Sequence, residues 1–245
     1  MIRIENLQKK FYKGDVHALK GINLEIPTGE FVVLIGANGS GKSTLLNAIA
    51  GNVIADAGVI MFDDINITSL PDHKRNKWIS RIFQNPLAGT APGLSVLENF
   101  RLASLRTKRK TLKIATTLSF KTFVSDRIAE LNMDLENKLD QPMGALSGGQ
   151  RQALTLLMSV MDNTRLLLMD EPVSALDPRT AELVMNLAER LIQKHKLTAI
   201  LVTHSLRDAL LYGNRIIQMA EGSIIKDLRG IEKTRLGKDE LFSWF

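Results

Sequence analysis

The sequence predicts an α/β fold whose parallel sheet is interrupted by a helical insertion. Three apolar runs, at 31–35, 165–169 and 198–202, are typical of strands buried on both faces. A helical pattern over about 179–195 separates the last two runs, as expected of strands joined by a crossover helix. Between about 95 and 160 the patterns are mainly helical, and this stretch forms the predicted insertion.

The composition is that of an ordinary globular protein. The 245 residues are 44% hydrophobic and 24% charged, which excludes disordered and low-complexity classes. The net charge of +6 suits a phosphate ligand or an acidic partner but is too small to indicate nucleic-acid binding. The absence of cysteine excludes disulfides, thiolate metal sites and a cysteine nucleophile. No secretory leader is expected at the N-terminus, and no apolar run approaches the ~18 residues of a membrane helix.

The first part of the chain is predicted to be rich in β-strands. Residues 2–7 and 18–26 alternate between apolar and polar side chains, and 27–30 form a turn before the apolar run at 31–35. Residues 58–62 and 65–67 have the pattern of two further short strands. Together they indicate a small β subdomain beside the main sheet.

The insertion and the C-terminal part are predicted from capping and periodicity. Ser95 followed by Glu98 is a capping box, so a helix is expected to begin there. Basic residues gather inside the insertion, either as a solvated loop or as a surface for an acidic partner or lipid head groups; they are Arg106, Lys108, Arg109, Lys110 and Lys113. Short strands are expected at 216–219 and 224–226, and a charged helical tail after Gly230.

A glycine-rich loop follows the strand at 31–35 and precedes a helical pattern at 45–50. It matches G-x-x-x-x-G-K-[ST], in which backbone N–H groups and a helix N-terminus surround phosphate groups. Lys42 is expected to bind the β- and γ-phosphates, and the Ser43 hydroxyl to bind Mg²⁺. Alone, this motif indicates only an NTPase, a GTPase or a kinase. The loop consists of Gly36, Ala37, Asn38, Gly39, Ser40, Gly41, Lys42, Ser43 and Thr44.

Two adjacent carboxylates end the apolar run at 165–169. Asp170 is predicted to hold Mg²⁺, directly or through water. Glu171 is predicted to polarise the attacking water as a general base. The alternative is an acidic strand end before the turn at Pro172, and the phosphate loop makes that alternative weak.

A second anion-binding loop precedes an apolar helix expected at 153–161. The pentapeptide Leu146-Ser147-Gly148-Gly149-Gln150 offers a hydroxyl, two flexible glycines and a helix N-terminus. The alternative is a simple helix-capping loop. A chain with two anion sites and one nucleotide suggests that the second site serves another copy of the chain.

With these motifs the chain resembles the ATP-binding cassette (ABC) superfamily over nearly its whole length. The resemblance implies a P-loop NTPase (RecA-like) parallel-sheet core with an antiparallel β subdomain and an inserted α-helical subdomain. It implies one ATPase domain over 1–245, with the core and β subdomain at 1–88 and 161–228, helices at 89–160 and a tail at 229–245. It also implies ATP and Mg²⁺ as ligands, and two copies paired head-to-tail around two ATP molecules.

Further residues are assigned by the resemblance alone. Gln84 matches the glutamine that binds Mg²⁺ and water, and His204 matches the switch histidine that contacts the γ-phosphate. The 174–177 segment matches the loop that communicates across the dimer. Phe11 matches the aromatic that stacks on adenine, with Tyr12 as an open alternative. The chain lacks an N-K-x-D guanine-reading motif, which favours ATP over GTP.

The resemblance also implies partners and location. Such a subunit works at the cytoplasmic face of the inner (plasma) membrane as a peripheral protein on an integral-membrane permease, and not on nucleic acid. The 85–92 and 213–215 segments look like those of a bacterial uptake group often labelled for tryptophan or tyrosine, which implies an extracytoplasmic substrate-binding protein. The alternatives are an exporter or lipoprotein-release ATPase, or a soluble ABC protein that does not transport. The ATPase chain itself does not identify the transported molecule.

Overall fold

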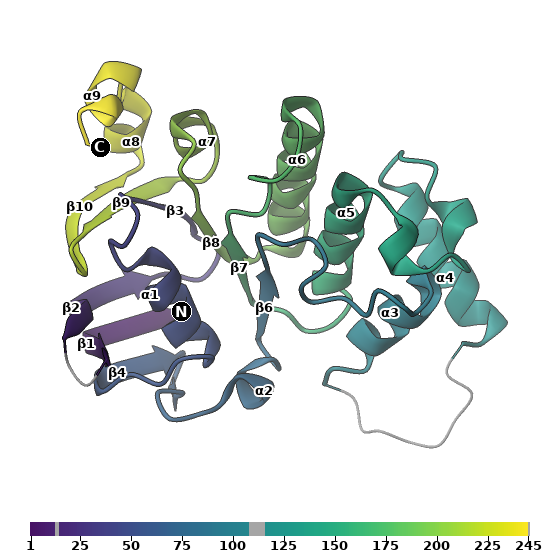
Figure 1. The fold of residues 1–245 in the computed structure, drawn as a ribbon, viewed down its shortest axis with the longest axis horizontal. Coiled ribbons are helices and arrows are strands. Elements are labelled where there is room, and N and C mark those ends of the chain that lie inside the picture. The colour runs from purple at the N-terminus through teal and green to yellow at the C-terminus, as the bar shows by residue number, and fades with distance from the viewer. Residues whose placement is uncertain (13–14, 108–115, 245) are drawn as a thin grey trace.

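A six-stranded sheet forms the centre of the molecule (Figure 1). The computed structural model describes residues 1–12, 15–107 and 116–244. The sheet has the order β10-β9-β3-β8-β7-β6, and all neighbouring pairs are parallel except β9 with β10. Its strands are β3 (Phe31–Ile35), β6 (Ile79–Ile82), β7 (Leu166–Asp170), β8 (Thr198–Val202), β9 (Arg215–Ala220) and β10 (Ser223–Arg229).

A second, antiparallel sheet lies beside helix α1 at the left of Figure 1. Its order is β2-β1-β4-β5. The strands are β1 (Ile2–Phe11), β2 (Val16–Ile26), β4 (Ala57–Phe62) and β5 (Ile65–Asn66). The alternating patterns therefore correctly predicted a β subdomain, although β1 and β2 extend further toward their connecting turn than expected.

The helices cover the central sheet, and α3, α4 and α5 lie together to its right (Figure 1). They are α1 (Lys42–Ala50), α2 (Asp72–Arg75), α3 (Val96–Ser104), α4 (Leu118–Ala129), α5 (Gly148–Ser159), α6 (Pro178–His195), α7 (Leu206–Leu211), α8 (Ile231–Arg235) and α9 (Lys238–Phe242). Two 3-10 turns, Glu136–Lys138 and Met143–Ala145, lead into α5.

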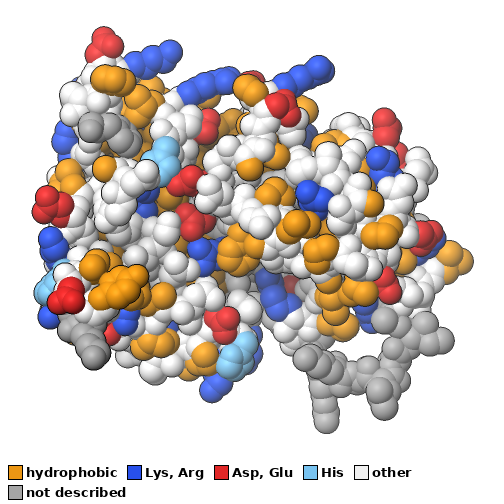
Figure 2. Space-filling model, viewed as in Figure 1, with side chains coloured by type: hydrophobic (Ala, Val, Ile, Leu, Met, Phe, Trp, Pro, Cys, Tyr) orange, Lys and Arg blue, Asp and Glu red, His pale blue; other side chains and the backbone are white. Residues whose placement is uncertain are grey.

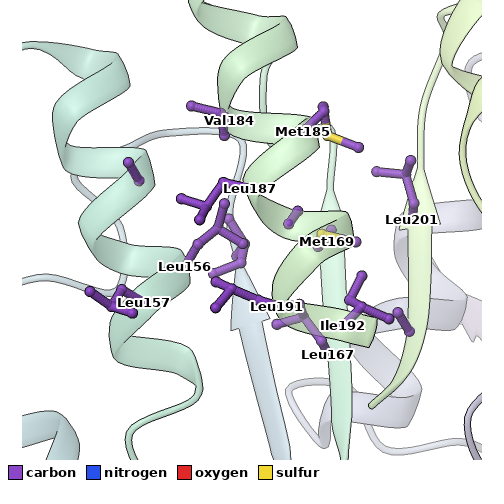
Figure 3. Close-up of a cluster of buried hydrophobic side chains, with 14 of the residues drawn as sticks. Leu156, Leu157, Leu167, Met169, Val184, Met185, Leu187, Leu191, Ile192 and Leu201 are labelled. Atoms are coloured by element: carbon purple, nitrogen blue, oxygen red, sulfur yellow. The ribbon is translucent and has the colours of Figure 1, made fainter. Parts of the chain in front are cut away.

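The central strands are buried on both faces, and each face contributes to a different hydrophobic core. Val33 of β3 packs with the helices of the insertion and with α6, whereas Leu34 packs with α1 and the antiparallel sheet. Figure 3 shows the first core between α5, α6, β7 and β8, with Leu156, Leu187 and Met169 pointing toward one another. Burial on both faces is the physical reason that these strands have continuous apolar sequences.

The structure confirms the strands at 31–35 and 198–202 at their predicted bounds. The Ser95–Glu98 capping box is also present, and α3 begins directly after it. Helix α5 begins at Gly148 instead of residue 153, because a second capping box, between Ser147 and Gln150, closes its first turn.

Three elements were not predicted: β6, α2 and α7. Strand β6 has only four residues, and Ser80 and Arg81 interrupt its apolar pattern. It forms because it pairs with β7, a tertiary contact that no local pattern reveals. Helices α2 and α7 are four and six residues long, too short for a helical period to be visible.

The predicted basic run falls largely outside the described residues, since Lys108, Arg109, Lys110 and Lys113 lie there. Arg106 is described and does not match a solvated charge. Its guanidinium donates to the hydroxyls of Ser80 and Thr164, the latter at 2.6 Å, and so attaches the end of the α3 segment to the central sheet.

The tail is helical, as expected, and packs on the protein core. Leu236, Leu241 and Trp244 are buried in the same core as α6. The Gln218 side chain donates to the Trp244 carbonyl, and the Lys226 ammonium lies 4.0 Å from the centre of the Trp244 ring. The tail is therefore part of the folded domain.

Candidate active site

A pocket of about 350 Å³ opens where strands β3, β7 and β8 end. Parallel strands present their carboxyl ends at one edge of a sheet, so the loops that follow them meet there. The lining includes Lys42 and Ser43 after β3, Glu171 after β7 and His204 after β8. Motifs separated by more than a hundred residues in the sequence thus form one site.

The loop after β3 approaches the rest of the protein too closely for side chains at two glycines. Gly36 and Gly41 have φ values of 147° and 102°. A Cβ at Gly36 would lie 2.1 Å from the Met219 carbonyl oxygen, and one at Gly41 would lie 2.5 Å from that of Ala18. Glycine is required at both positions because they combine a positive φ with close backbone contact.

Lys42 begins α1 and is buried beneath this loop. Its ammonium donates to the carbonyl oxygens of Gly36 at 2.8 Å and Ala37 at 2.9 Å. Burial lowers the pKa of Lys42, while the charges of Glu171 and Asp170 act to raise that pKa. A cation at the N-terminus of a helix, beneath a curved backbone loop, is the arrangement that binds phosphate groups.

Oxygen ligands lie next to the phosphate loop. The Ser43 hydroxyl donates to Asp170 Oδ1 at 3.2 Å. Arg81 Nη2 donates to the other oxygen, Asp170 Oδ2, at 2.8 Å. A hydroxyl and a carboxylate are hard oxygen donors, so this pair fits Mg²⁺.

Glu171 is held in an unusual backbone conformation. Its φ is 48°, in the left-handed region that is costly for a residue with a Cβ. Its N–H donates to the Val202 carbonyl at 3.0 Å, which fixes this turn against β8. Its carboxylate Oε1 lies 2.7 Å from His204 Nε2. The local strain and the histidine contact together point the carboxylate into the pocket.

The remaining loop residues surround this centre. The lining of the pocket also contains Asn38, Gly39, Gly41 and Thr44. Ser40 is buried, and its N–H donates to the Ala37 carbonyl at 3.2 Å, which closes the turn of the loop. At the outer rim lies Phe11. Tyr12 is 79% exposed and does not belong to the described lining.

Two predicted groups lie elsewhere. Gln84 follows β6 and is exposed, and the 147–150 loop begins α5. Within the described residues, neither borders the pocket. The 147–150 loop packs on the start of α6, so tightly that a Cβ at Gly149 would lie 2.1 Å from Thr180 Cγ2. One copy of the chain therefore brings together the phosphate loop, the two carboxylates and His204, but leaves the second anion loop apart.

Arg81 is one residue at this site that sequence reasoning missed. The pocket lining also includes residues of β2 and of the β9–β10 turn that were not assigned to a site, namely Val16, His17, Ala18, Lys20 and Glu221. The available signal for Arg81 was a charged residue inside a mainly apolar stretch, Ile79-Ser80-Arg81-Ile82-Phe83, immediately before Gln84. Its importance depends on the pairing of β6 with β7, which places it beside Asp170.

The sequence model of the ABC transporter family matches residues 19–174. The chain belongs to the ABC transporter family. The matched span contains the phosphate loop, both carboxylates and the 147–150 loop, so the resemblance to the family is confirmed. The chain is an ABC ATPase with the P-loop NTPase fold that the resemblance implied.

Known ABC proteins resemble this chain over its whole length. A tyrosine transport ATP-binding protein of Clostridioides difficile is 39% identical over 249 residues, covering 100% of this chain and 98% of the relative. A phosphonates import ATP-binding protein of Rhizobium meliloti is 32% identical over 230 residues, covering 93% and 81%. The dimeric post-hydrolysis structure of the cassette MJ0796 with ADP and Pi has a TM-score of 0.80 at 29% identity, covering 97% of this ABC ATPase and 100% of that chain.

In the part of the ABC ATPase that the structure describes, no helix has both the length and the apolar character needed to cross a bilayer.

Proposed function

We propose that this ABC ATPase is the ATP-hydrolysing subunit of a bacterial importer for an amino acid or a similar small molecule. The observation that carries the pairing of two subunits is the separation of two anion-binding loops in one chain, with only the phosphate loop bordering the pocket. A second copy, paired head-to-tail, supplies the missing loop. The relative named for tyrosine transport, alike over its full length, supports uptake and an amino-acid substrate.

ATP binds with its phosphates on the loop after β3. Lys42 and the N-terminus of α1 bind the phosphate oxygens, and Phe11 stacks on the adenine at the rim. Ser43, Asp170 and Gln84 would hold Mg²⁺, which neutralises charge on the phosphate oxygens. Because Ser43 and Asp170 already lie in contact, these two ligands need little rearrangement to bind the ion.

Glu171 and His204 act on the attacking water. The Glu171 carboxylate accepts a hydrogen bond from that water and polarises it. His204, 2.7 Å away, keeps the carboxylate directed into the site and also contacts the γ-phosphate. The left-handed backbone at Glu171 maintains this direction before substrate arrives, which reduces reorganisation during the reaction.

The second copy completes each site through its 147–150 loop. Ser147, Gly148, Gly149 and Gln150 of one copy bind the γ-phosphate held by the other. Hydrolysis removes the ligand that both copies share, so the dimer opens. Binding and hydrolysis of ATP thereby close and open the pair of subunits.

A groove of about 1060 Å³ accepts the permease. Figure 2 shows this face indented between the part that carries α2 and the helices α3 to α5. The lining combines residues 89–91, which belong to the 85–92 segment that resembles the uptake group, with Arg101 and Arg106. A cytoplasmic helix of an integral-membrane permease binds here, which places the ATPase at the cytoplasmic face of the membrane. The permease receives its substrate from an extracytoplasmic binding protein.

Nucleotide-dependent dimerisation tests the proposed pairing of two copies around ATP. With the non-hydrolysable ATP analogue AMP-PNP, the wild type is expected to elute as a dimer in size-exclusion chromatography with light scattering, and as a monomer without nucleotide. Gly148→Asp should bind ATP but stay monomeric, because a carboxylate at this loop repels the γ-phosphate of the other copy. Gly93→Asp is the matched control, since Gly93 has open space around its Cβ position. A Gly148→Asp protein that dimerises like the wild type contradicts the paired-site arrangement.

Co-purification tests the transport role. The tagged chain is recovered from solubilised native membranes, and the accompanying proteins are identified by mass spectrometry. A polytopic permease with an extracytoplasmic binding protein supports import. The melting temperature of that binding protein, measured with and without tyrosine, tryptophan and other amino acids, then tests the substrate. A permease with large extracytoplasmic domains and no binding protein would instead support export or release.

A further inference from the structure

Arg81 contacts the carboxylate proposed as a Mg²⁺ ligand. It lies on β6, which pairs in parallel with β7, the strand that ends in Asp170. Arg81 Nη2 is 2.8 Å from Asp170 Oδ2, and the two side chains are only 13% and 15% exposed. The ion pair is therefore shielded from water, where a charge-assisted contact is stronger than at an open surface.

The guanidinium is held from two other directions. Nη1 donates to the side-chain oxygen of Asn47, on α1, and to that of Asn52 at 3.2 Å. Its central carbon lies 4.8 Å from the centre of the Phe83 ring. A planar guanidinium with fixed contacts at both Nη atoms and over its face cannot rotate freely.

This clamp gives each oxygen of Asp170 a separate partner. Oδ2 faces Arg81, and Oδ1 faces the Ser43 hydroxyl at 3.2 Å. The oxygen nearest the phosphate loop is thus the one left for a metal ion. The positive charge of Arg81 also offsets the repulsion between Asp170 and the adjacent Glu171 carboxylate.

We propose that Arg81 is a positioning residue for Mg²⁺: through its clamped guanidinium it fixes Asp170 so that Oδ1 is ready to bind the ion beside Ser43. The inference rests on the proposed function, because it takes Ser43 and Asp170 as the metal ligands. It follows the general behaviour of groups that orient a metal ligand, whose loss weakens metal binding although they never touch the metal.

Equilibrium binding of a non-hydrolysable ATP analogue tests this role without turnover. AMP-PNP is titrated by calorimetry into the wild type, in EDTA and in excess Mg²⁺, and the ratio of the two affinities gives the Mg²⁺ gain. Arg81→Met removes the charge but keeps a long side chain over Phe83. Its Mg²⁺ gain is expected to fall about tenfold, whereas its affinity in EDTA should stay within about twofold of the wild type.

Arg165→Met is the matched control. Arg165 also pairs with an aspartate, Asp63, at 2.7 Å, and lies over a phenylalanine ring, Phe62, at 5.3 Å, but both partners belong to the β subdomain and neither is part of the described pocket lining. Its Mg²⁺ gain should equal that of the wild type. Arg81→Lys keeps the charge but lacks the planar guanidinium whose two Nη atoms bond Asn47 and Asp170, so its gain should fall between those of the wild type and Arg81→Met.

The outcomes separate this inference from the proposed function. A wild type that does not bind AMP-PNP contradicts the proposed ATPase site itself. A normal Mg²⁺ gain in Arg81→Met, or an equal loss in Arg165→Met, contradicts the role of Arg81 alone. If circular dichroism shows that Arg81→Met is unfolded, Arg81→Lys decides: a Mg²⁺ gain equal to that of the wild type overturns the inference.

Discussion

Charged side chains are used differently in two regions of this protein. Between α1 and α2, Arg75 is completely buried, and its guanidinium donates only to backbone carbonyl oxygens. The four acceptors belong to Ala48, Ile49, Thr68 and Leu70. The first two belong to the last turn of α1, whose free carbonyls carry the negative end of the helix dipole. All of these hydrogen bonds join the guanidinium to the protein's own backbone.

At the carboxyl edge of the sheet, the charged side chains border the pocket, where a ligand can replace their contacts. His204 is 38% exposed, and its Glu171 partner sits on a left-handed turn beside the pocket. Lys42 contacts carbonyl oxygens of the loop proposed to bind phosphate groups, and a bound phosphate would replace those contacts. The difference teaches that a charge whose backbone acceptors lie inside the fold stabilises the fold, whereas a charge whose acceptors border an open pocket can exchange them for a ligand. Substitutions in the two regions should therefore have opposite effects on stability and on turnover.

The largest expected effect is on ATP turnover, from a substitution at the pocket on the carboxyl edge of the sheet. Glu171→Gln should lower ATP turnover roughly 10³-fold, because the amide cannot polarise the attacking water as the carboxylate does. The melting temperature should stay within about 2 °C of the wild type, since a neutral amide of the same shape replaces a partly exposed acid. Phosphate release measures the first quantity and calorimetry the second. ATP should also hold this variant as a dimer.

Glu182→Gln is the control for that substitution. Glu182 pairs with a basic partner, Arg207, at 2.8 Å on the exposed face of α6. Its loss should leave turnover within about twofold. Undiminished hydrolysis by Glu171→Gln would show that another group activates the water.

The next largest effect is expected on stability instead of turnover, from a substitution of the buried Arg75. Arg75→Met should destabilise the protein by about 3 kcal/mol, because buried carbonyl oxygens lose their donors. That corresponds to a fall in melting temperature of about 6–12 °C for a chain of this size. Arg3→Met, which removes a half-exposed ion pair with Glu5, should cost less than about 1 kcal/mol. Equal melting temperatures for the two variants would contradict the closed network around Arg75.

The contrast between the regions also explains what the sequence could predict of the fold. Strands β3 and β8 were predicted at their observed bounds because burial on both faces requires continuous apolar residues. Strand β6 could not be predicted in this way. Its Ser80 and Arg81 interrupt the apolar pattern, and both are satisfied by distant partners: Ser159 for the first and Asp170 for the second.

The candidate site shows the same limit. Lys42, Ser43, Asp170 and Glu171 were predicted from motifs and His204 from the family resemblance, and these residues lie together, although their catalytic roles remain proposals. Motifs reveal groups that act directly on a ligand, because the chemistry fixes residue types at fixed spacings. A supporting side chain such as Arg81 has no such spacing, since its partner lies 89 residues away along the chain.

A smaller effect is expected from pH at the buried lysine of the tail. Lys233 on α8 donates to the carbonyl oxygens of Tyr212 and Gly213, the latter at 2.7 Å. Burial lowers the pKa of Lys233 to about 8, below the 10.5 of an unperturbed lysine. The folded state therefore disfavours the charged form. This penalty is fully present below pH 8 and is relieved as the pH rises from about 8 toward 10.5.

Lys233→Met isolates this contribution. From pH 7.5 to 9.5 the lysine of the wild type should gain about 2 kcal/mol of stability, at 1.36 kcal/mol for each pKa unit. Urea unfolding at several pH values measures the difference between the two proteins, which cancels the other titrating groups. If that difference does not change between pH 7.5 and 9.5, Lys233 titrates as an ordinary lysine and its charge is not closed off from water.

The smallest effect separates two neighbouring aromatic residues, one at the open edge and one outside it. Phe11 is half-buried at the rim of the pocket, with the Lys9 ammonium 5.4 Å from its ring centre. Tyr12 is 79% exposed, and its backbone is in the left-handed conformation. Stacking on a base contributes about 1–3 kcal/mol, so Phe11→Ala should weaken ATP binding about tenfold. Tyr12→Ala should weaken it less than about twofold. Fluorescence titration with a labelled ATP measures both affinities, and Phe11→Trp should retain that of the wild type because a larger ring still offers a stacking face. The reverse ranking of Phe11→Ala and Tyr12→Ala would assign the stacking to Tyr12.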